Sequence, residues 1–236
     1  MIPKRIACVY ISPSLLQPLQ HECWERIRAL HPTWEVTLWR DAEAEAFVKD
    51  HCLDFWELYD WYPKNVQRAD LFRMLLIHRL GGFYLDLDIH LHRSLDPLCA
   101  EHAVFPYEWE MSPATFLSRH KRAPTDRSEL WQLGNYAFGA EAGHPFIAEI
   151  LEEMIRRSSL IEPCRLEDND VLYTTGPDLV SGVFHSKKDV FGPCVTRLMG
   201  QNKPPPPKPP IEGDPRWQQF GVYGNHLLSG AWKGGR

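Results

Sequence analysis

The sequence lacks three features that would indicate a membrane-spanning, nucleic-acid-binding or disulfide-rich protein. It has no run of about 18 apolar residues, so it predicts no transmembrane helix, and its N-terminus has no signal-peptide layout. Its 26 lysines and arginines are outnumbered by 31 aspartates and glutamates, whereas a general nucleic-acid binder carries a basic stripe. Its six cysteines form no CxxC pair, which argues against a zinc site or a disulfide framework. We therefore expect reduced thiols, no nucleic-acid partner and a cytoplasmic protein, with peripheral attachment at the inner membrane left open.

What the sequence does contain is the pattern of an α/β protein. Its 236 residues suit a single domain over 1–236 with a sizeable core, and 44% of them are hydrophobic. Short apolar runs alternate with segments of helical periodicity, which indicates helices packed on a sheet. Asp41 is the predicted N-cap of the second helix. The expected strands are 6–11, 34–39, 83–89, 103–105 and 135–140, and the expected helices are 18–30, 42–51, 66–80, 146–157 and one from 178.

Near the C-terminus, residues 201–210 contain six prolines. Proline fixes φ and removes a backbone donor, so this stretch predicts a polyproline II surface loop. Its Pro-x-x-Pro spacing leaves an SH3-type contact open, but a solvated spacer or lid is the favoured interpretation.

The most informative stretch of the chain ends in two carboxylates. A helical segment leads into Gly81-Gly82, then into a short apolar run, and then into Asp86 and Asp88. In a continuous strand these two side chains would point the same way and repel each other. A hard divalent cation relieves such repulsion, because oxygen ligands suit Mg²⁺ and Mn²⁺, and such a cation usually takes up substrate phosphates as well. The pattern predicts a metal site for a phosphate-bearing donor.

Two charged residues precede this motif on the helix. Asp70 and Arg73 are three residues apart and share a face. A surface ion pair worth little is the simplest alternative. Because this helix leads directly into the two carboxylates, we favour an interpretation in which Asp70 and Arg73 face the donor's sugar or phosphates.

Further candidates lie at the two ends of the chain. His226 is a predicted third metal ligand, and the indole N–H of Trp232 a predicted phosphate donor. His90 and His92 are expected to be structural. Tyr10 ends the first strand, where a ring could stack on a nucleobase or simply fill the rim of the core.

These residues together resemble glycosyltransferase family 32, the group with a DXD-containing sugar-binding region. That group includes yeast α-1,6-mannosyltransferases and bacterial polysaccharide enzymes, and it is distantly similar to clostridial glucosylating toxins. The most specific similarity is Arg-Ala-Asp-Leu-Phe-Arg at 68–73 followed by Gly-Gly-Phe-Tyr-Leu-Asp-Leu-Asp at 81–88. The opening Ile-Pro-Lys at 2–4 also resembles the start of the family. Asn135, Gly176-Pro177 and the pair His226 and Trp232 follow the signature in the expected order.

The resemblance implies a GT-A fold, with a Rossmann-like mixed sheet flanked by helices. It also implies a retaining glycosyltransferase (a hexosyltransferase) that uses a nucleoside diphosphate sugar and Mn²⁺ or Mg²⁺. By this resemblance the catalytic residues are Asp70, Arg73, Asp86 and Asp88, and the metal ligands are Asp86, Asp88 and His226. The donor-binding residues that it implies are Tyr10, Asp70, Arg73, Tyr84, Asp86, Asn135 and Trp232.

The expected reaction moves a hexose from a UDP-sugar, or alternatively from GDP-mannose, to an acceptor hydroxyl. A glycan is the favoured acceptor, as in polysaccharide biosynthesis, and a lipid-linked sugar or a protein side chain stays open. Ala7, Cys8 and Ala231 depart from the family pattern. They keep open a non-catalytic relative that binds nucleotide-sugar or glycan, and the paired carboxylates keep open a metal-dependent phosphohydrolase.

Overall fold

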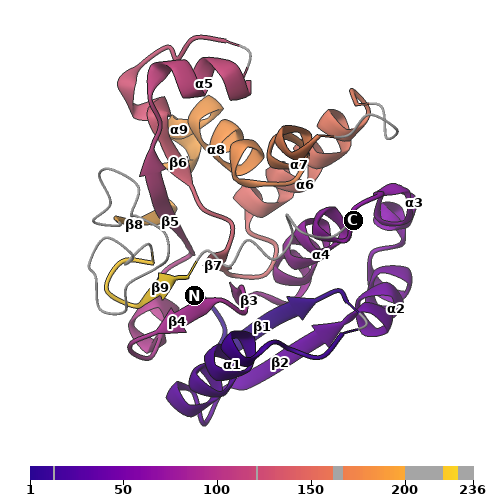
Figure 1. Ribbon diagram of the computed structural model, residues 1–236. Coiled ribbons are helices and arrows are strands. Elements are labelled where there is room, and N and C mark those ends of the chain that lie inside the picture. The colour runs from indigo at the N-terminus through magenta and orange to yellow at the C-terminus, as the bar shows by residue number, and fades with distance from the viewer. Residues whose placement is uncertain (13, 121, 162–166, 200–219, 228–236) are drawn as a thin grey trace.

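The computed structural model describes residues 1–12, 14–120, 122–161, 167–199 and 220–227 (Figure 1). The predicted proline-rich segment 201–210 and Trp232 lie outside these residues. The strands are β1 Arg5–Tyr10, β2 Glu35–Arg40, β3 Gly82–Leu85, β4 Ile89–Leu91, β5 Ala103–Glu110, β6 Trp131–Leu133, β7 Ala137–Ala140, β8 Val195–Met199 and β9 Gly224–His226. The α-helices are α1 Pro18–Leu30, α2 Asp41–His51, α3 Trp56–Trp61, α4 Asn65–Leu80, α5 Pro113–His120, α6 Pro145–Ser158, α7 Asp168–Thr174, α8 Pro177–Ser186 and α9 Lys188–Phe191.

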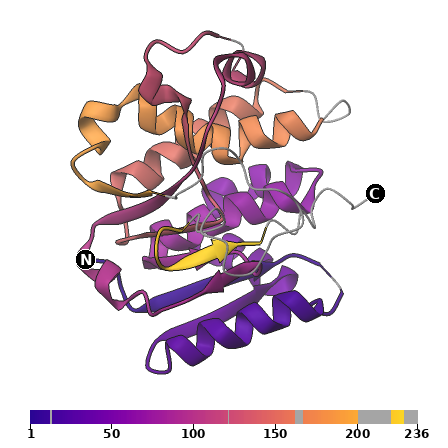
Figure 2. The ribbon, with the colours of Figure 1, turned by 60° about the vertical axis from the view of Figure 1, so that its left-hand side comes forward.

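The described strands form a seven-stranded mixed sheet and a separate two-stranded ribbon. In the sheet the order is β2-β1-β3-β7-β5-β6, and β8 also pairs with β5. β1 is parallel to β2 and β3, whereas β7 is antiparallel to its neighbours β3 and β5. The ribbon joins β4 to β9, and Figure 2 shows β9 in yellow near the middle of the molecule. The predicted α/β class with a mixed sheet is confirmed.

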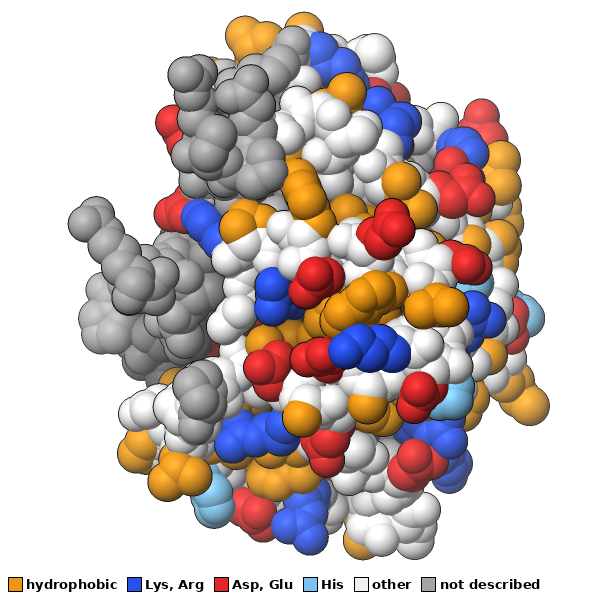
Figure 3. Space-filling model, turned by 90° about the vertical axis from the view of Figure 1, so that its right-hand side faces the viewer, with side chains coloured by type: hydrophobic (Ala, Val, Ile, Leu, Met, Phe, Trp, Pro, Cys, Tyr) orange, Lys and Arg blue, Asp and Glu red, His pale blue; other side chains and the backbone are white. Residues whose placement is uncertain are grey.

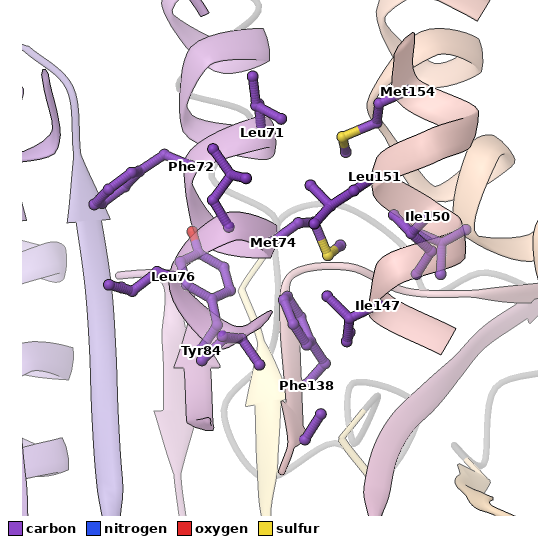
Figure 4. Packing of buried hydrophobic residues seen from close by; sticks show 14 of the residues in the cluster. Leu71, Phe72, Met74, Leu76, Tyr84, Phe138, Ile147, Ile150, Leu151 and Met154 are labelled. Atoms are coloured by element: carbon purple, nitrogen blue, oxygen red, sulfur yellow. The ribbon is translucent and has the colours of Figure 1, made fainter. Parts of the chain in front are cut away.

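One face of the sheet packs against α4 and α6. Figure 4 shows Met74 of α4 and Leu151 of α6 meeting between the two helices, with Tyr84 and Phe138 of the strands beside them. The other face packs on α1 and the β4–β9 ribbon. Figure 3 shows acidic and basic side chains mixed over the side of the molecule where α2 and α3 lie, with a small apolar cluster among them. The sheet is therefore covered on both faces, and its carboxyl-end edge supplies the polar residues described below.

Most predicted elements are found within two residues of their expected bounds, two expectations were wrong, and one helix was not predicted. Asp41 is the first residue of α2 rather than its N-cap, because the N-cap is Arg40, whose backbone N–H is bound by the Glu43 carboxylate at 2.8 Å. The expected strand 83–89 is two strands separated by a turn. The segment between 108 and 127 contains helix α5, which the sequence did not predict because Phe116 is its one buried residue.

His31, at the end of α1, makes folding dependent on pH. Its Nε2 accepts a hydrogen bond from the backbone N–H of Leu95 at 3.0 Å, and its Nδ1 donates to the carbonyl of Ile27 at 2.8 Å. Only a neutral imidazole can do both. Burial lowers the pKa of His31 below its ordinary value of 6.5, although the Ile27 carbonyl and Asp96 oppose this.

We expect the free energy of unfolding to fall as pH drops from 7.5 to 5. Below about pH 6.5 the unfolded chain takes up a proton that folded His31 rejects, which costs at most about 1.4 kcal/mol per pH unit for one group. Urea unfolding at several pH values measures this slope. His31→Asn should make the slope shallower, and the same change at exposed His21 should not. An unchanged slope in His31→Asn would contradict the prediction.

Candidate active site

The two carboxylates of the Asp-x-Asp motif lie on a turn, not in a strand. β7 begins at Ala137, opposite Leu85, so the ladder of β3 ends there. The N–H of Asp86 still donates to the carbonyl of Tyr136 at 2.7 Å, and the N–H of Ile89 then donates to the carbonyl of Asp86 at 3.1 Å, which closes the turn. The expectation that strand alternation aligns Asp86 and Asp88 is therefore wrong. The two side chains come together because the turn folds them to the same side.

His226 reaches this turn through the small ribbon. β9 pairs antiparallel with β4, with His226 opposite Ile89, and the N–H of Leu227 donates to the carbonyl of Asp88 at 2.9 Å. The Nε2 atom of His226 lies 3.4 Å from Oδ1 of Asp88. The ring of Tyr136 stacks on the imidazole with 4.1 Å between centroids, which fixes its orientation. A residue 138 positions away in sequence from Asp88 is thus held next to it.

Asp86, Asp88 and His226 fit a hard or borderline divalent cation. One ligand atom from each lies within 4.8 Å of the others, and two oxygens with one imidazole nitrogen suit Mn²⁺. Burial raises the pKa of Asp86, as does nearby Asp88, while Arg73 lowers it. Burial works against a charge on His226, yet the carboxylates of Asp88, Asp86 and Glu108 together outweigh it and raise the pKa of that histidine. The site therefore carries a negative potential that a cation would offset.

The pair Asp70 and Arg73 is buried beside this turn rather than exposed. Their side chains are 2% and 7% exposed and contact each other directly. Arg73 also donates to Oδ1 of Asp86 at 3.2 Å and to the carbonyl of Asn135 at 2.9 Å. Tyr84 donates its hydroxyl to the same Asp86 carboxylate, and its ring lies under the guanidinium. Arg73 is the cation that holds Asp70 and Asp86 in place, so the surface ion-pair alternative does not apply.

Thr175 belongs to this cluster, although the sequence analysis did not identify it. Its hydroxyl donates to Oδ2 of Asp70 at 2.7 Å, and the side-chain amide of Asn135 lies 3.5 Å from Oδ1. Thr175 is fully buried and stands directly before Gly176-Pro177, where α8 begins. The Gly-Pro pair was the one signal that a helix start lies here, but nothing local connected it with Asp70, which is 105 residues away.

Replacing Thr175 with valine should lower kcat/KM about tenfold or more. The change keeps the shape and removes a hydrogen bond to a charged group, which is worth about 1.5–3 kcal/mol. We expect Thr175→Ser to restore most of the activity. Thr174→Val is the matched control, because the hydroxyl of Thr174 bonds to the carbonyl of Asp170 and to Gln67 instead. Steady-state kinetics with melting curves would separate the two effects, and equal kinetics for both valine variants would contradict a positioning role for Thr175.

The remaining predicted residues lie around the same edge of the sheet. Tyr10 ends β1, its hydroxyl is 2.9 Å from Oγ of Ser14, and the Arg40 guanidinium lies over its ring at 4.9 Å. His90 and His92 pack on each other in the β4–β9 ribbon, and His92 bonds Asn225 at 3.0 Å. The predicted roles of Tyr10 in base stacking and of Trp232 in phosphate binding stay predictions.

This combination of sheet, turn and buried ion pair defines the class of protein. A mixed sheet with an Asp-x-Asp turn at the end of its third strand is a glycosyltransferase fold of the GT-A type. The solved PaToxG glycosyltransferase has the same fold, with a TM-score of 0.53 at 15% sequence identity over 81% of this chain and 71% of that one. The predicted GT-A fold is confirmed.

The sequence comparisons narrow the class further. Residues 18–105 match the family model described as "Glycosyltransferase sugar-binding region containing DXD motif". Inositol phosphoceramide mannosyltransferase 3 of Schizosaccharomyces pombe is 31% identical over 64% of this chain and 36% of its own length. Mannosyl phosphorylinositol ceramide synthase SUR1 of Saccharomyces cerevisiae is 30% identical over 65% of this chain and 35% of its own.

These matches confirm the resemblance to the DXD-containing glycosyltransferases. The matched region holds Asp70, Arg73, Asp86 and Asp88, whereas Asn135 and His226 lie beyond it. The chain spans about a third of the length of the curated relatives it matches. The chain has a glycosyltransferase fold and a region similar to the DXD sugar-binding region, and its activity, donor, acceptor and stereochemistry are matters for proposal.

Proposed function

We propose that this chain transfers a hexose from a nucleoside diphosphate sugar to an acceptor hydroxyl, in a metal-dependent reaction that retains the anomeric configuration. The observation that carries the proposal is the convergence of Asp86, Asp88 and His226 next to the buried Asp70–Arg73 pair. This places a cation-binding set beside a rigid, oxygen-binding cluster. Metal-assisted transfer from a nucleoside diphosphate sugar needs both a bound cation and fixed polar groups that hold the donor.

Each part of the cluster has a distinct task in this reaction. Asp86, Asp88 and His226 would hold Mn²⁺ or Mg²⁺, which when bound offsets the negative charge of the departing diphosphate. Arg73 pairs with Asp70 and Asp86 and fixes their positions, so that they do not reorient during the reaction. Thr175 and Asn135 orient Asp70, which would accept hydrogen bonds from the sugar. The sequence singled out no protein nucleophile, so attack on the same face as the leaving group accounts best for retention.

The relatives' names indicate where to look for the donor and acceptor. Both are named for mannose and for an inositol phosphoceramide, so mannose becomes the first sugar to test, ahead of the UDP-hexoses favoured by the sequence. The favoured acceptor is then a ring hydroxyl of an inositol-containing lipid or of a glycan. Among the described residues, no helix has both the length and the apolar character needed to cross a membrane. We propose that the chain acts as a peripheral protein at a membrane surface.

A donor screen tests this proposal. The chain would be incubated with GDP-mannose and with UDP-hexoses, with Mn²⁺ or with a chelator, and the released nucleoside diphosphate measured. We expect release from one donor that depends on the metal. Release of phosphate from a chromogenic ester in place of nucleotide would identify a phosphohydrolase, and binding of donor without turnover would identify a non-catalytic relative.

A further inference from the structure

Glu108 is a carboxylate at the edge of the proposed site that neither the sequence pattern nor the comparisons assign to any role. It lies on β5, the long strand that leads toward α5 in Figure 1. Tyr107 pairs with Leu133 and Trp109 with Gln132, so Glu108 has no partner on β6 and forms a bulge. Bulges of this kind commonly redirect a side chain beside an active site.

The register of the sheet places Glu108 level with the Asp-x-Asp turn. Ala140 of β7 pairs with both Gly82 of β3 and Ala103 of β5, so these two strands run in the same direction on either side of β7. Asp86 and Asp88 follow Gly82 by four and six residues, and Glu108 follows Ala103 by five. Two strand spacings separate the strands, so their backbones are about 10 Å apart at this level. The chain of β7 lies between the two backbones, so a ring that contacts side chains from both strands would lie over this edge of the sheet.

Charged groups from two parts of the molecule act on Glu108. Burial raises the pKa of Glu108, His226 and Arg119 lower it, and Asp178 and Asp86 raise it again. His226 and Asp86 belong to the candidate metal site, whereas Asp178 and Arg119 form an ion pair between α8 and α5. Glu108 also helps to raise the pKa of Tyr136, after burial, so it is a neighbour of the ring that stacks on His226.

Glu108 differs from Asp86 and Asp178 in having no hydrogen-bond or ion-pair partner among the residues that the structure describes. Asp178 accepts from Arg119 at 2.8 Å and from Gln132 at 2.7 Å, and Asp86 accepts from Arg73 and Tyr84. Within the described parts of the chain, the Glu108 carboxylate makes no hydrogen bond and no ion pair. It is half-buried and therefore reachable from solvent. A partly desolvated carboxylate without a donor is costly unless a ligand or water supplies one.

We propose that Glu108 binds the acceptor, and that its carboxylate accepts hydrogen bonds from hydroxyl groups of a polyol ring, either a sugar or an inositol. This rests on the proposed function. Phe105 and Tyr107 of β5 pack in the core cluster that contains α4, whereas Val104 packs on the opposite face together with Tyr136. Alternation along β5 up to the bulge therefore places Glu108 on the Val104 face, opposite to α4, the helix that carries Asp70 and Arg73. The donor's sugar and the acceptor's ring would be held by different carboxylates on opposite sides of the transfer point.

The test compares Glu108→Ala with Glu110→Ala. Glu110 is a second glutamate on β5, two residues further along, so it matches Glu108 in type and strand. It pairs with Arg127 at 3.3 Å. Acceptor-stimulated nucleotide release would be measured with Mn²⁺, with myo-inositol as one acceptor probe and methyl α-mannopyranoside as the other. Donor binding would be measured separately by calorimetry, and folding by melting curves.

We expect Glu108→Ala to raise the acceptor KM about tenfold or more, because bonds to a charged group are lost, while the donor Kd is retained. The probe whose KM rises identifies the ring as inositol or sugar. Three results would overturn the proposal: equal KM values for the two alanine variants, an equal loss of donor binding in Glu108→Ala, or no stimulation of the unaltered chain by either probe. Failure of the proposed function would be seen differently, as absence of nucleotide release from every donor by the unaltered chain.

Discussion

Asp88→Ala should lower metal-dependent nucleotide release from the donor by about a thousandfold or more. Asp88 is one of the three candidate ligands, and its backbone carbonyl also binds Leu227 next to His226. Loss of a ligand removes the charge compensation that the cation supplies, which is worth several kcal/mol in the transition state, and about 1.4 kcal/mol is a factor of ten. The measurement is initial rate against Mn²⁺ concentration.

Folding gives an independent readout for Asp88→Ala. The variant loses the repulsion between Asp86 and Asp88 and also the contact of Asp88 with His226, so the readout is the change in melting temperature on adding Mn²⁺ and not its absolute value. Mn²⁺ should raise the melting temperature of the unaltered chain and leave that of Asp88→Ala unchanged. Asp54→Asn, at an exposed carboxylate, is the control. Full activity in Asp88→Ala, or an equal response of both proteins to Mn²⁺, would rule out the metal assignment.

Arg73→Met has the second large effect, on stability and activity together. Arg73 is 7% exposed and pairs with Asp70 and Asp86, so its loss leaves one buried and one partly exposed carboxylate without their cation. Breaking a buried pair by removing one partner costs about 3–5 kcal/mol. For a chain of this size, that cost corresponds to a fall in melting temperature of about 10 °C. We expect activity to fall below detection, measured as released nucleotide.

A double variant separates the structural effect from the catalytic one. Asp70→Asn combined with Arg73→Met removes one uncompensated charge while keeping a group that can bond Thr175. We expect this double variant to regain most of the lost melting temperature and none of the activity. Arg79→Met, at an exposed position of the same helix, should leave both unchanged. A double variant that recovers activity along with stability would show that Arg73 has only a structural role.

Local sequence pattern was sufficient for most of the helices and for the residues of the Asp-x-Asp motif and the helix before it. Helical periodicity up to Gly81-Gly82 located α4, and the apolar run after it located β3, because both signals lie within one element. The same local pattern was wrong about the strand 83–89. The end of β3 depends on where its partner β7 begins, at Ala137, and no residue between 83 and 89 encodes that.

The residues that the sequence could not identify are those whose role depends on distant pairing. Thr175 meets Asp70 only because α8 packs on α6, which packs in turn on α4. Glu108 is level with the turn only through the register of three strands. His226 was predicted as a ligand, but the reason that it reaches Asp88 is the β4–β9 ribbon. In each case the residue type can be read from the sequence, whereas its position depends on pairing between segments that are far apart in the sequence.

The most direct test of the cation-dependent donor site is calorimetric binding of a nucleoside diphosphate. GDP and UDP would each be titrated into the chain with Mn²⁺ and with EDTA, and the titrations repeated with Asp88→Asn and His226→Gln. The geometry predicts one-to-one binding of one nucleotide that requires Mn²⁺ and is lost in both variants. Binding of equal affinity in EDTA, or in the two variants, would contradict a metal held by Asp86, Asp88 and His226.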